Sequence, residues 1–264
     1  GLNSVVFNMS RSTGPALAGV LIAMFGTGAS YAVQAAFFFL STLLTSFLTI
    51  GRTPPTSPSG HSKRGAFGQS IVEGWRFGWS NQTVRAGLLI TMAASLFIIP
   101  FTTLLPVFAK DILGVGATGQ GFLLTGMGVG ALCSAVLIAS VGDRLPRGIV
   151  MLGGVILYGL SVTAFSISPW FNVSFLLMIV VGLFHVTSHA LVQTVIQTHS
   201  PTEFRGRVMA IFQQGHFVLT IGAMIYGVLA SLWGAQWTVT TMAIVGSLSM
   251  VLIYITLPSA RRIQ

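Results

Sequence analysis

The chain has 264 residues and a formal net charge of +9, yet only 6% of its residues are charged and 53% are hydrophobic. A soluble domain carries about 25% charged residues, so the composition excludes a soluble enzyme and indicates that lipid surrounds most side chains. The single cysteine, Cys133, excludes an internal disulfide.

Long uncharged runs predict the membrane spans, because a spanning helix needs about 20 mainly apolar residues. Short polar or glycine-rich breaks divide the longer runs in two. The sequence therefore predicts an all-α, polytopic membrane helix bundle. Its expected spans are eight in number, at about 5–25, 31–50, 86–108, 118–141, 148–167, 171–195, 207–232 and 237–257.

The basic residues predict the orientation of these spans. Lys110 is alone on one side of the predicted membrane, whereas the other twelve of the 13 basic residues lie on the opposite side. Cytoplasmic loops collect Lys and Arg, so both termini are expected in the cytoplasm, and the cations are read as topology signals rather than as a nucleic-acid site. The twelve are Arg11, Arg52, Lys63, Arg64, Arg76, Arg85, Arg144, Arg147, Arg205, Arg207, Arg261 and Arg262.

Small residues mark two spans as surfaces for close helix approach. The first span contains Gly14, Pro15 and Gly19, and the fourth contains Gly126 and Gly130. Small side chains let backbones approach, and proline bends a membrane helix. Simple helix packing is the alternative to a functional role. Arg11, in the first span, is expected at its cytoplasmic end or beside an acidic partner.

The one long polar connection, residues 51–85, begins with a turn-rich linker. Its second part places Phe67, Ile71, Trp75 and Trp79 at intervals of four residues. This spacing favours an amphipathic helix in the lipid headgroup layer, and an irregular loop is the alternative.

The third span carries Thr91, Ser95 and Thr102, which are four and seven residues apart and so share one helix face. These hydroxyl groups are candidates for the wall of a substrate cavity.

The sixth span carries a polar stripe, with His185, His189, Gln193 and Gln197 at every fourth position. Burying such groups without partners costs several kcal/mol, so the stripe is expected to face a cavity or to hydrogen-bond a neighbouring helix. Histidines at i and i+4 can also bind a metal. This span contains no Asp, Glu or Cys to complete a site, so no metal and no cofactor are expected.

A cluster of charged residues lies between the fourth and fifth predicted spans. Residues 142–148 contain Asp143, Arg144 and Arg147, and the runs on either side are uncharged. A group that only sets topology is one interpretation of this cluster. The chain contains no Walker A motif and no evident catalytic set, so neither an ATP-driven pump nor an enzyme is expected.

Three motifs in this order resemble the bacterial drug and siderophore exporters of the major facilitator superfamily. The segment 139–147 (ASVGDRLPR) is similar to that superfamily's loop motif in its second-half copy, although Ala139 and Pro146 replace the usual glycines. The segment 14–19 (GPALAG) resembles the exporter signature, and 203–209 (EFRGRVM) resembles the segment before the eleventh helix.

The resemblance implies a twelve-helix fold of which this chain supplies the fifth to twelfth helices. Residues 1–50 would then be a remnant of the N-terminal half, 51–85 a cytoplasmic linker with an interfacial helix, and 86–264 a complete six-helix C-terminal half. The first four helices, which in many exporters carry the proton-coupling carboxylate, would be missing. A fragment alone is not expected to transport.

The resemblance also implies a function: proton-coupled efflux of small amphipathic molecules across the bacterial plasma (inner) membrane by alternating access, with a monomer as the full-length state. Thr91, Ser95, Thr102, His185, His189 and Gln193 would line the cavity. Because these groups are uncharged, apolar or weakly cationic substrates are expected.

A gate is implied at the cytoplasmic side, where Asp143, Arg144 and Arg147 would meet Arg11. The alternatives to an exporter are a non-transporting membrane scaffold or sensor, whose cavity would be filled, and a facilitator that imports a small polar solute.

Overall fold

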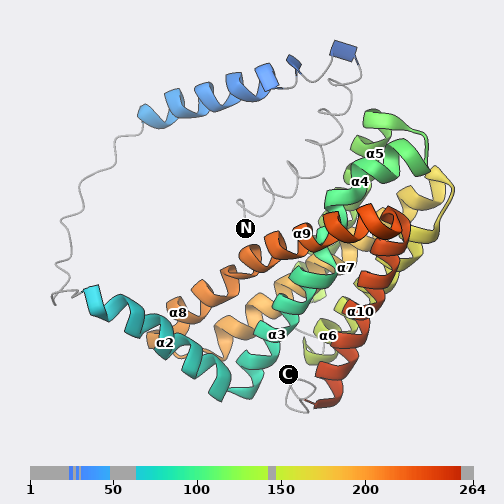
Figure 1. Cartoon of the computed structure of the whole chain (residues 1–264). Helices are drawn as coiled ribbons and strands as arrows, with labels where there is room; N and C mark the ends of the chain where they lie inside the picture. Colours follow the sequence, from blue (N-terminus) through green and yellow to red (C-terminus); the bar gives the residue numbers. More distant parts are fainter. Residues whose placement is uncertain (1–23, 26–27, 30, 48–63, 142–146, 257–264) are drawn as a thin grey trace.

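The computed structural model describes residues 24–25, 28–29, 31–47, 64–141 and 147–256, and this part of the chain is helical with no strand (Figure 1). Six helical stretches are long and apolar enough to cross a membrane: Gln82–Ile112, Gly116–Ile138, Val150–Ile167, Phe171–Thr198, Thr202–Trp233 and Ala235–Thr256. They correspond to the third to eighth predicted spans, so the expected all-α membrane bundle is confirmed. The first predicted span lies mostly outside the described residues.

Among the described residues, a shorter apolar helix and an amphipathic helix precede the bundle. A shorter apolar helix, Tyr31–Ser46, lies within the second predicted span, and each of its residues is exposed. Helix α2 (Arg64–Ser80) covers the predicted amphipathic stretch. Asn81 ends α2 and starts α3 (Gln82–Phe97), because its side-chain oxygen accepts hydrogen bonds from the Thr83 and Val84 amides at 3.0 and 3.1 Å.

The first span of the bundle is interrupted. Proline at position 100 has no N–H to donate, and α3 gives way to a 3₁₀ segment, η1 (Ile99–Leu104). A short turn, α4 (Leu105–Val107), and a π-helical segment, η2 (Phe108–Ile112), complete the span. The remaining helices are α5 (Gly116–Val141), α6 (Arg147–Ile167), α7 (Phe171–Thr198), α8 (Thr202–Gln213), α9 (Gly215–Trp233) and α10 (Ala235–Thr256).

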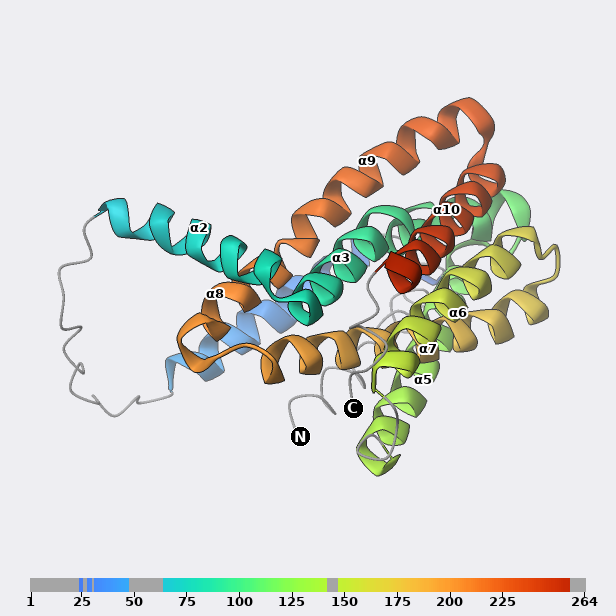
Figure 2. The same cartoon turned by 90° about the horizontal axis from the view of Figure 1, so that it is seen from below.

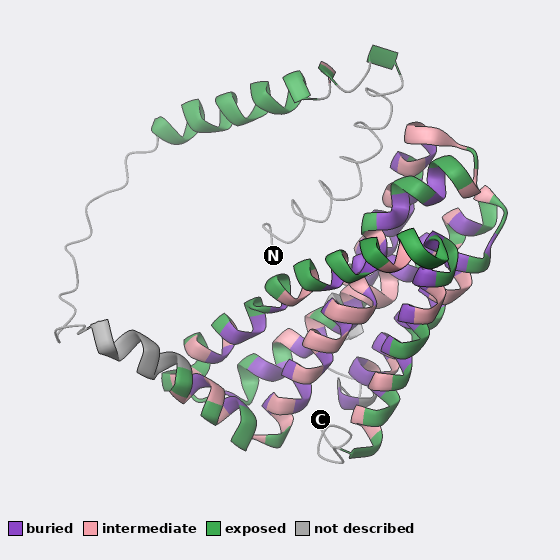
Figure 3. Ribbon diagram, viewed as in Figure 1, coloured by how far each residue is buried: buried purple, intermediate pink, exposed green. Residues whose placement is uncertain are grey.

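Helix α7 has its most extensive contacts with α5 and α6, while α10 packs on α6 and α3 (Figures 1 and 2). The core between these helices is apolar: Phe165 on α6 lies 6.0 Å from Phe101 and 5.2 Å from Phe108, measured between ring centroids. Buried residues line the inner faces of the bundle, whereas outward faces are exposed (Figure 3). That distribution is expected of helices whose outer faces contact lipid.

Glycines bring α5 and α7 into backbone contact. A Cβ added at Gly130 would meet the carbonyl of Ile179, and one added at Gly182 would meet the carbonyl of Met127. A Cβ at Gly126 would lie 3.1 Å from the Phe175 carbonyl oxygen. The close approach at Gly126 and Gly130 is therefore to α7.

Candidate functional site

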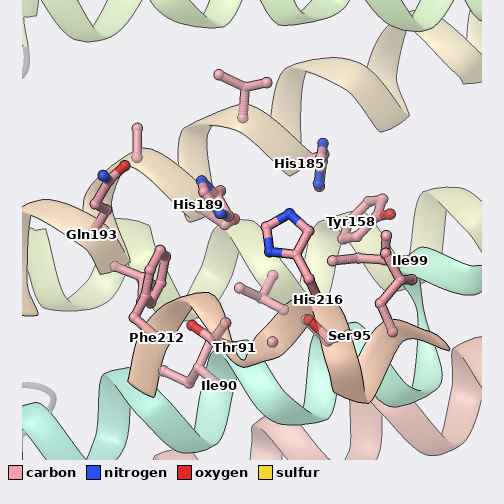
Figure 4. Close-up of a pocket in the computed structure, with 18 of the residues that line it drawn as sticks. Ile90, Thr91, Ser95, Ile99, Tyr158, His185, His189, Gln193, Phe212 and His216 are labelled. Carbon is pink, nitrogen blue, oxygen red and sulfur yellow. The ribbon is translucent and has the colours of Figure 1, made fainter. Parts of the chain in front are cut away.

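A cavity of about 580 Å³ opens between α3, α6, α7 and the junction of α8 with α9 (Figure 4). Its size is within the range of small-molecule sites, about 300–1,000 Å³. Five of the residues predicted from sequence for a cavity line it together: Thr91, Ser95, His185, His189 and Gln193. Thr91 and Ser95 lie on α3 and the other three on α7, so the two groups are about 90 residues apart in the sequence.

Helix α7 supplies the longest polar edge of the cavity. Because the helix is unbroken from Phe171 to Thr198, positions four apart stay on one face, and His185, His189 and Gln193 follow one another along the wall. The ring centroids of His185 and His189 are 6.3 Å apart. Gln197 is exposed beyond the end of the cavity.

Helix α3 contributes the opposite wall. Thr91 donates its hydroxyl hydrogen to the Gly87 carbonyl at 2.9 Å, and Ser95 lies buried one turn further along. Thr102, the sixth residue predicted for the cavity, is not among the residues that line this one. It lies in η1, where each residue turns about 120° rather than 100°, so the spacing from Ser95 no longer keeps it on the same face. Its hydroxyl instead donates to the Ile99 carbonyl at 3.1 Å.

The junction of α8 and α9 forms the third side. Gly215 allows α9 to start beside α3, since an added Cβ would lie 3.1 Å from the Thr91 methyl and 3.2 Å from the Ser95 hydroxyl. The next residue, His216, points into the cavity toward α7 (Figure 4). Its Nδ1 lies 3.2 Å from the Gln213 carbonyl oxygen.

Aromatic side chains extend the histidine edge at both ends. The Tyr158 ring lies 5.1 Å from His185, and the Phe212 ring lies 5.3 Å from His189. Neither aromatic residue was predicted for the site. Each is a single residue in an apolar stretch, and such a position carries no periodic signal that separates it from core packing.

The cavity wall is polar but contains no permanent charge. Among the lining residues that the structure describes, none is Asp, Glu, Lys or Arg. No group of three or more His, Cys, Asp or Glu within the described ranges could hold a metal ion. The groups that can act here are imidazoles, amides, hydroxyls and aromatic faces, which suit reversible binding of a small molecule.

Helix α2 packs against α8, the helix that leads into the cavity. Arg207 on α8 forms an ion pair and hydrogen bond with Glu73 on α2, and the Phe77 and Phe204 rings stack with centroids 4.9 Å apart. Gly74 on α2 lies where the two helices approach closely, because an added Cβ would be 3.0 Å from the Arg207 Cβ on α8. The sequence predicted an amphipathic helix but not this contact.

The predicted gate cannot be located, because Arg11, Asp143 and Arg144 lie outside the described residues, as does the side chain of Arg147. The same holds for the first-span motif of Gly14, Pro15 and Gly19.

The chain is similar to several bacterial transporters. It is 26% identical to the multidrug efflux pump Tap of Mycolicibacterium fortuitum, over 90% of this chain and 58% of the relative. The staphyloferrin A transporter of Staphylococcus aureus is 23% identical, over 92% of this chain and 59% of the relative. The enterobactin exporter EntS of Escherichia coli is 26% identical, over 83% and 51% respectively.

These matches cover most of the chain but only 51–59% of the three relatives, so the chain spans a little more than half the length of the curated relatives it matches. The sequence profile of a family described as "transmembrane secretion effector" matches residues 1–262. The chain therefore belongs to the transmembrane secretion effector family of the major facilitator superfamily.

Proposed function

We propose that the whole protein is a secondary transporter that exports small amphipathic molecules from the bacterial cytoplasm by alternating access, driven by the proton gradient. The observation that carries this proposal is the cavity of about 580 Å³, whose wall combines apolar, aromatic and uncharged polar side chains. Family membership and the named exporters among the relatives support the same function.

Residues 82–256 contribute six spans, and we propose that they are the six-helix C-terminal half of the transporter. Exposure of the span Thr202–Trp233 supports a missing neighbour, since 17% of its most apolar window is buried against 39–56% in the other five spans. Residues 1–50 would belong to the other half, with both termini in the cytoplasm and Asp143, Arg144, Arg147 and Arg11 at the gate between the halves. The transporter would act as a monomer.

Efflux of a fluorescent dye tests this function. Cells that lack their own exporters and express the protein as encoded are loaded with an amphipathic dye, and dye loss is followed with and without a protonophore. We expect energised efflux that the protonophore abolishes. Ser95→Phe should reduce efflux at least fivefold, because the ring fills the cavity.

The matched control is Ser231→Phe on the exposed face of α9, where the Ser231 hydroxyl donates to the Val228 carbonyl of its own helix. That variant should export the dye at the unmodified rate. If the unmodified protein and the Ser231→Phe variant both fold in the membrane but export no dye, the protein would be a scaffold or sensor, and the exporter proposal would be wrong.

A further inference from the structure

Helix α2 presents an exposed face that combines two large apolar side chains with one cation. Val72 is 65% exposed and Trp79 is 48% exposed, and Arg76 between them is exposed as well. Their spacing of four and three residues places all three on one side of the helix, and we call them the outer face of α2. The sequence predicted an apolar face that included Trp75, but Trp75 is half-buried and packs against the core.

The opposite side of α2 is fixed on the bundle. A Cβ added at Gly74 would lie 3.0 Å from the Arg207 Cβ on α8, and one added at Gly78 would lie 3.0 Å from the Leu88 side chain on α3. Glu73 forms its ion pair with Arg207 on the same side. These contacts set the rotation of α2 about its own axis, so the outer face points away from the bundle.

The ion pair also determines the charge of the outer face. Glu73 and Arg76 are the two charged side chains between positions 72 and 80, and the pair with Arg207 neutralises the first. Among the described carboxylates, Glu73, Asp111 and Glu203, none forms an ion pair with Arg76. The outer face therefore carries a positive charge flanked by apolar groups.

Helix α2 lies at the level where the membrane spans begin. It ends at Ser80, and the span Gln82–Ile112 starts two residues later. At 1.5 Å per residue its 31 residues extend about 45 Å, which equals the bilayer thickness with both headgroup layers included. The first residues of the span are then in a headgroup layer. Helix α2 runs across the ends of α3 and α8 at this level (Figure 1).

We propose that the outer face of α2 binds anionic phospholipid headgroups of the membrane that surrounds the bundle. The Arg76 guanidinium pairs with a lipid phosphate, which it matches in charge and in hydrogen-bonding geometry. Indole rings favour the boundary between headgroups and acyl chains, where Trp79 and Val72 lose contact with water. The lipid contact anchors α8 through α2, and α8 carries Phe212 in the cavity wall.

Lipid quenching of a fluorophore on the outer face tests this proposal. In a Cys133→Ser background, Val72→Cys is labelled, and the chain as encoded is placed in bilayers of equal parts phosphatidylcholine and phosphatidylglycerol. One lipid or the other carries brominated acyl chains, which quench on contact. We expect phosphatidylglycerol to associate with this position about fivefold more strongly than phosphatidylcholine, the effect of one basic residue near an anionic surface. Iodide in the water should quench weakly.

Two variants separate the charge of Arg76 from general attraction to the membrane. R76Q keeps a long polar side chain without the cation, so both brominated lipids should quench the label on position 72 equally. R205Q is the matched control, because Arg205 is exposed on α8 and is not part of the outer face. This variant should keep the preference of the unmodified protein. Circular dichroism of each variant reports on folding.

A label on Leu248→Cys gives the baseline, since Leu248 is 61% exposed inside the apolar span Ala235–Thr256, where both lipids should quench equally. The proposal is overturned if both lipids also quench equally at position 72, or if R76Q keeps the preference. Quenching by iodide instead of by brominated lipid would overturn it too, because the outer face would then be open to water and to a soluble partner. The measurement requires no transport, so its result is independent of the exporter proposal.

Discussion

The hydroxyl of Tyr226 on α9 donates a hydrogen bond of 2.6 Å to the backbone carbonyl of Phe97 on α3. That carbonyl lies where α3 ends before Pro100, and the next amide that could reach it, at Phe101, bonds to Ile98 instead. Gly222 lets α9 approach this break, because an added Cβ would lie 2.7 Å from the Leu96 carbonyl oxygen. Helix α9 thus supplies a hydrogen-bond donor to the Phe97 carbonyl, which the interruption of α3 leaves without a backbone donor from its own helix.

Tyr226→Phe should destabilise the protein, because it removes the donor of this part-buried hydrogen bond to the Phe97 carbonyl. We expect the free energy of unfolding to fall by about 1–3 kcal/mol, measured as a lower midpoint of thermal unfolding in detergent. Ser231→Ala, which deletes a hydroxyl bonded within α9 itself, should leave the midpoint unchanged. Equal midpoints for the two variants would show that the bond does not stabilise the break.

The glycine contact between α5 and α7 gives a second prediction. Gly130→Ala and Gly182→Ala each place a methyl group against a carbonyl of the facing helix, so each should lower stability by about 1–3 kcal/mol. Because both changes separate the same two helices, the double variant should cost less than the sum. Gly227→Ala, where an added Cβ meets nothing within 4 Å, should be neutral or slightly stabilising. Additive losses would contradict a shared interface.

The contact between α2 and α8 gives a third prediction. Glu73 and Arg207 are about 42% and 37% exposed, so their ion pair contributes at most about 1 kcal/mol and has little effect on global unfolding. Glu73→Arg should nevertheless detach α2, which is measured as faster hydrogen exchange of its amides at residues 72–80. The swap E73R/R207E should restore slow exchange.

Glu203→Gln is the control for that experiment, since it removes a carboxylate from the first turn of the same helix, α8, without touching α2. Its exchange should match the unmodified protein. If the swap exchanges as fast as the single variant, the ion pair does not hold α2 in place.

Water access to the cavity gives a fourth prediction. In a Cys133→Ser background, Thr91→Cys should react with a charged thiol reagent, because Thr91 lines the cavity and is only half-buried. Ser134→Cys should not react, since Ser134 is buried between α5 and α7 at 2.7 Å from the Thr187 hydroxyl. An amphipathic cation should protect the first position. Equal reactivity at the two positions would mean that the cavity is not open to water.

The sequence predicted the parts of the site that lie on unbroken helices. Spacing by four placed His185, His189 and Gln193 on one wall because α7 has no interruption. The same spacing does not bring Thr102 to this cavity, because the 3₁₀ segment changes the angle per residue. The six spans that the structure describes were predicted from charge-free runs, for which local composition is sufficient.

Long-range contacts could not be predicted in this way. Glu73 and Arg207 are 134 residues apart, and nothing near either residue indicates its partner. Tyr158 on α6, Phe212 on α8 and His216 on α9 reach the cavity only because these three helices pack on α3 or α7 at particular positions. Crossing positions depend on glycines such as Gly215, whose role appears only when the facing helix is known.

Helices α3 and α7 touch closely near one end and diverge toward the cavity. At Gly87 an added Cβ would lie 2.9 Å from the Ile196 side chain, whereas Ile99, at the start of η1 just beyond the end of α3, lines the cavity. Helix α3 could tilt relative to α7 about this close contact. At 1.5 Å per residue the arm from Gly87 to Ile99 is about 18 Å long, so a tilt of about 10° would displace Ile99 by about 3 Å. A close contact between small residues at a helix crossing therefore converts a slight tilt into a larger displacement at the cavity. A displacement of that size would be enough for the cavity to admit or exclude an aromatic ring.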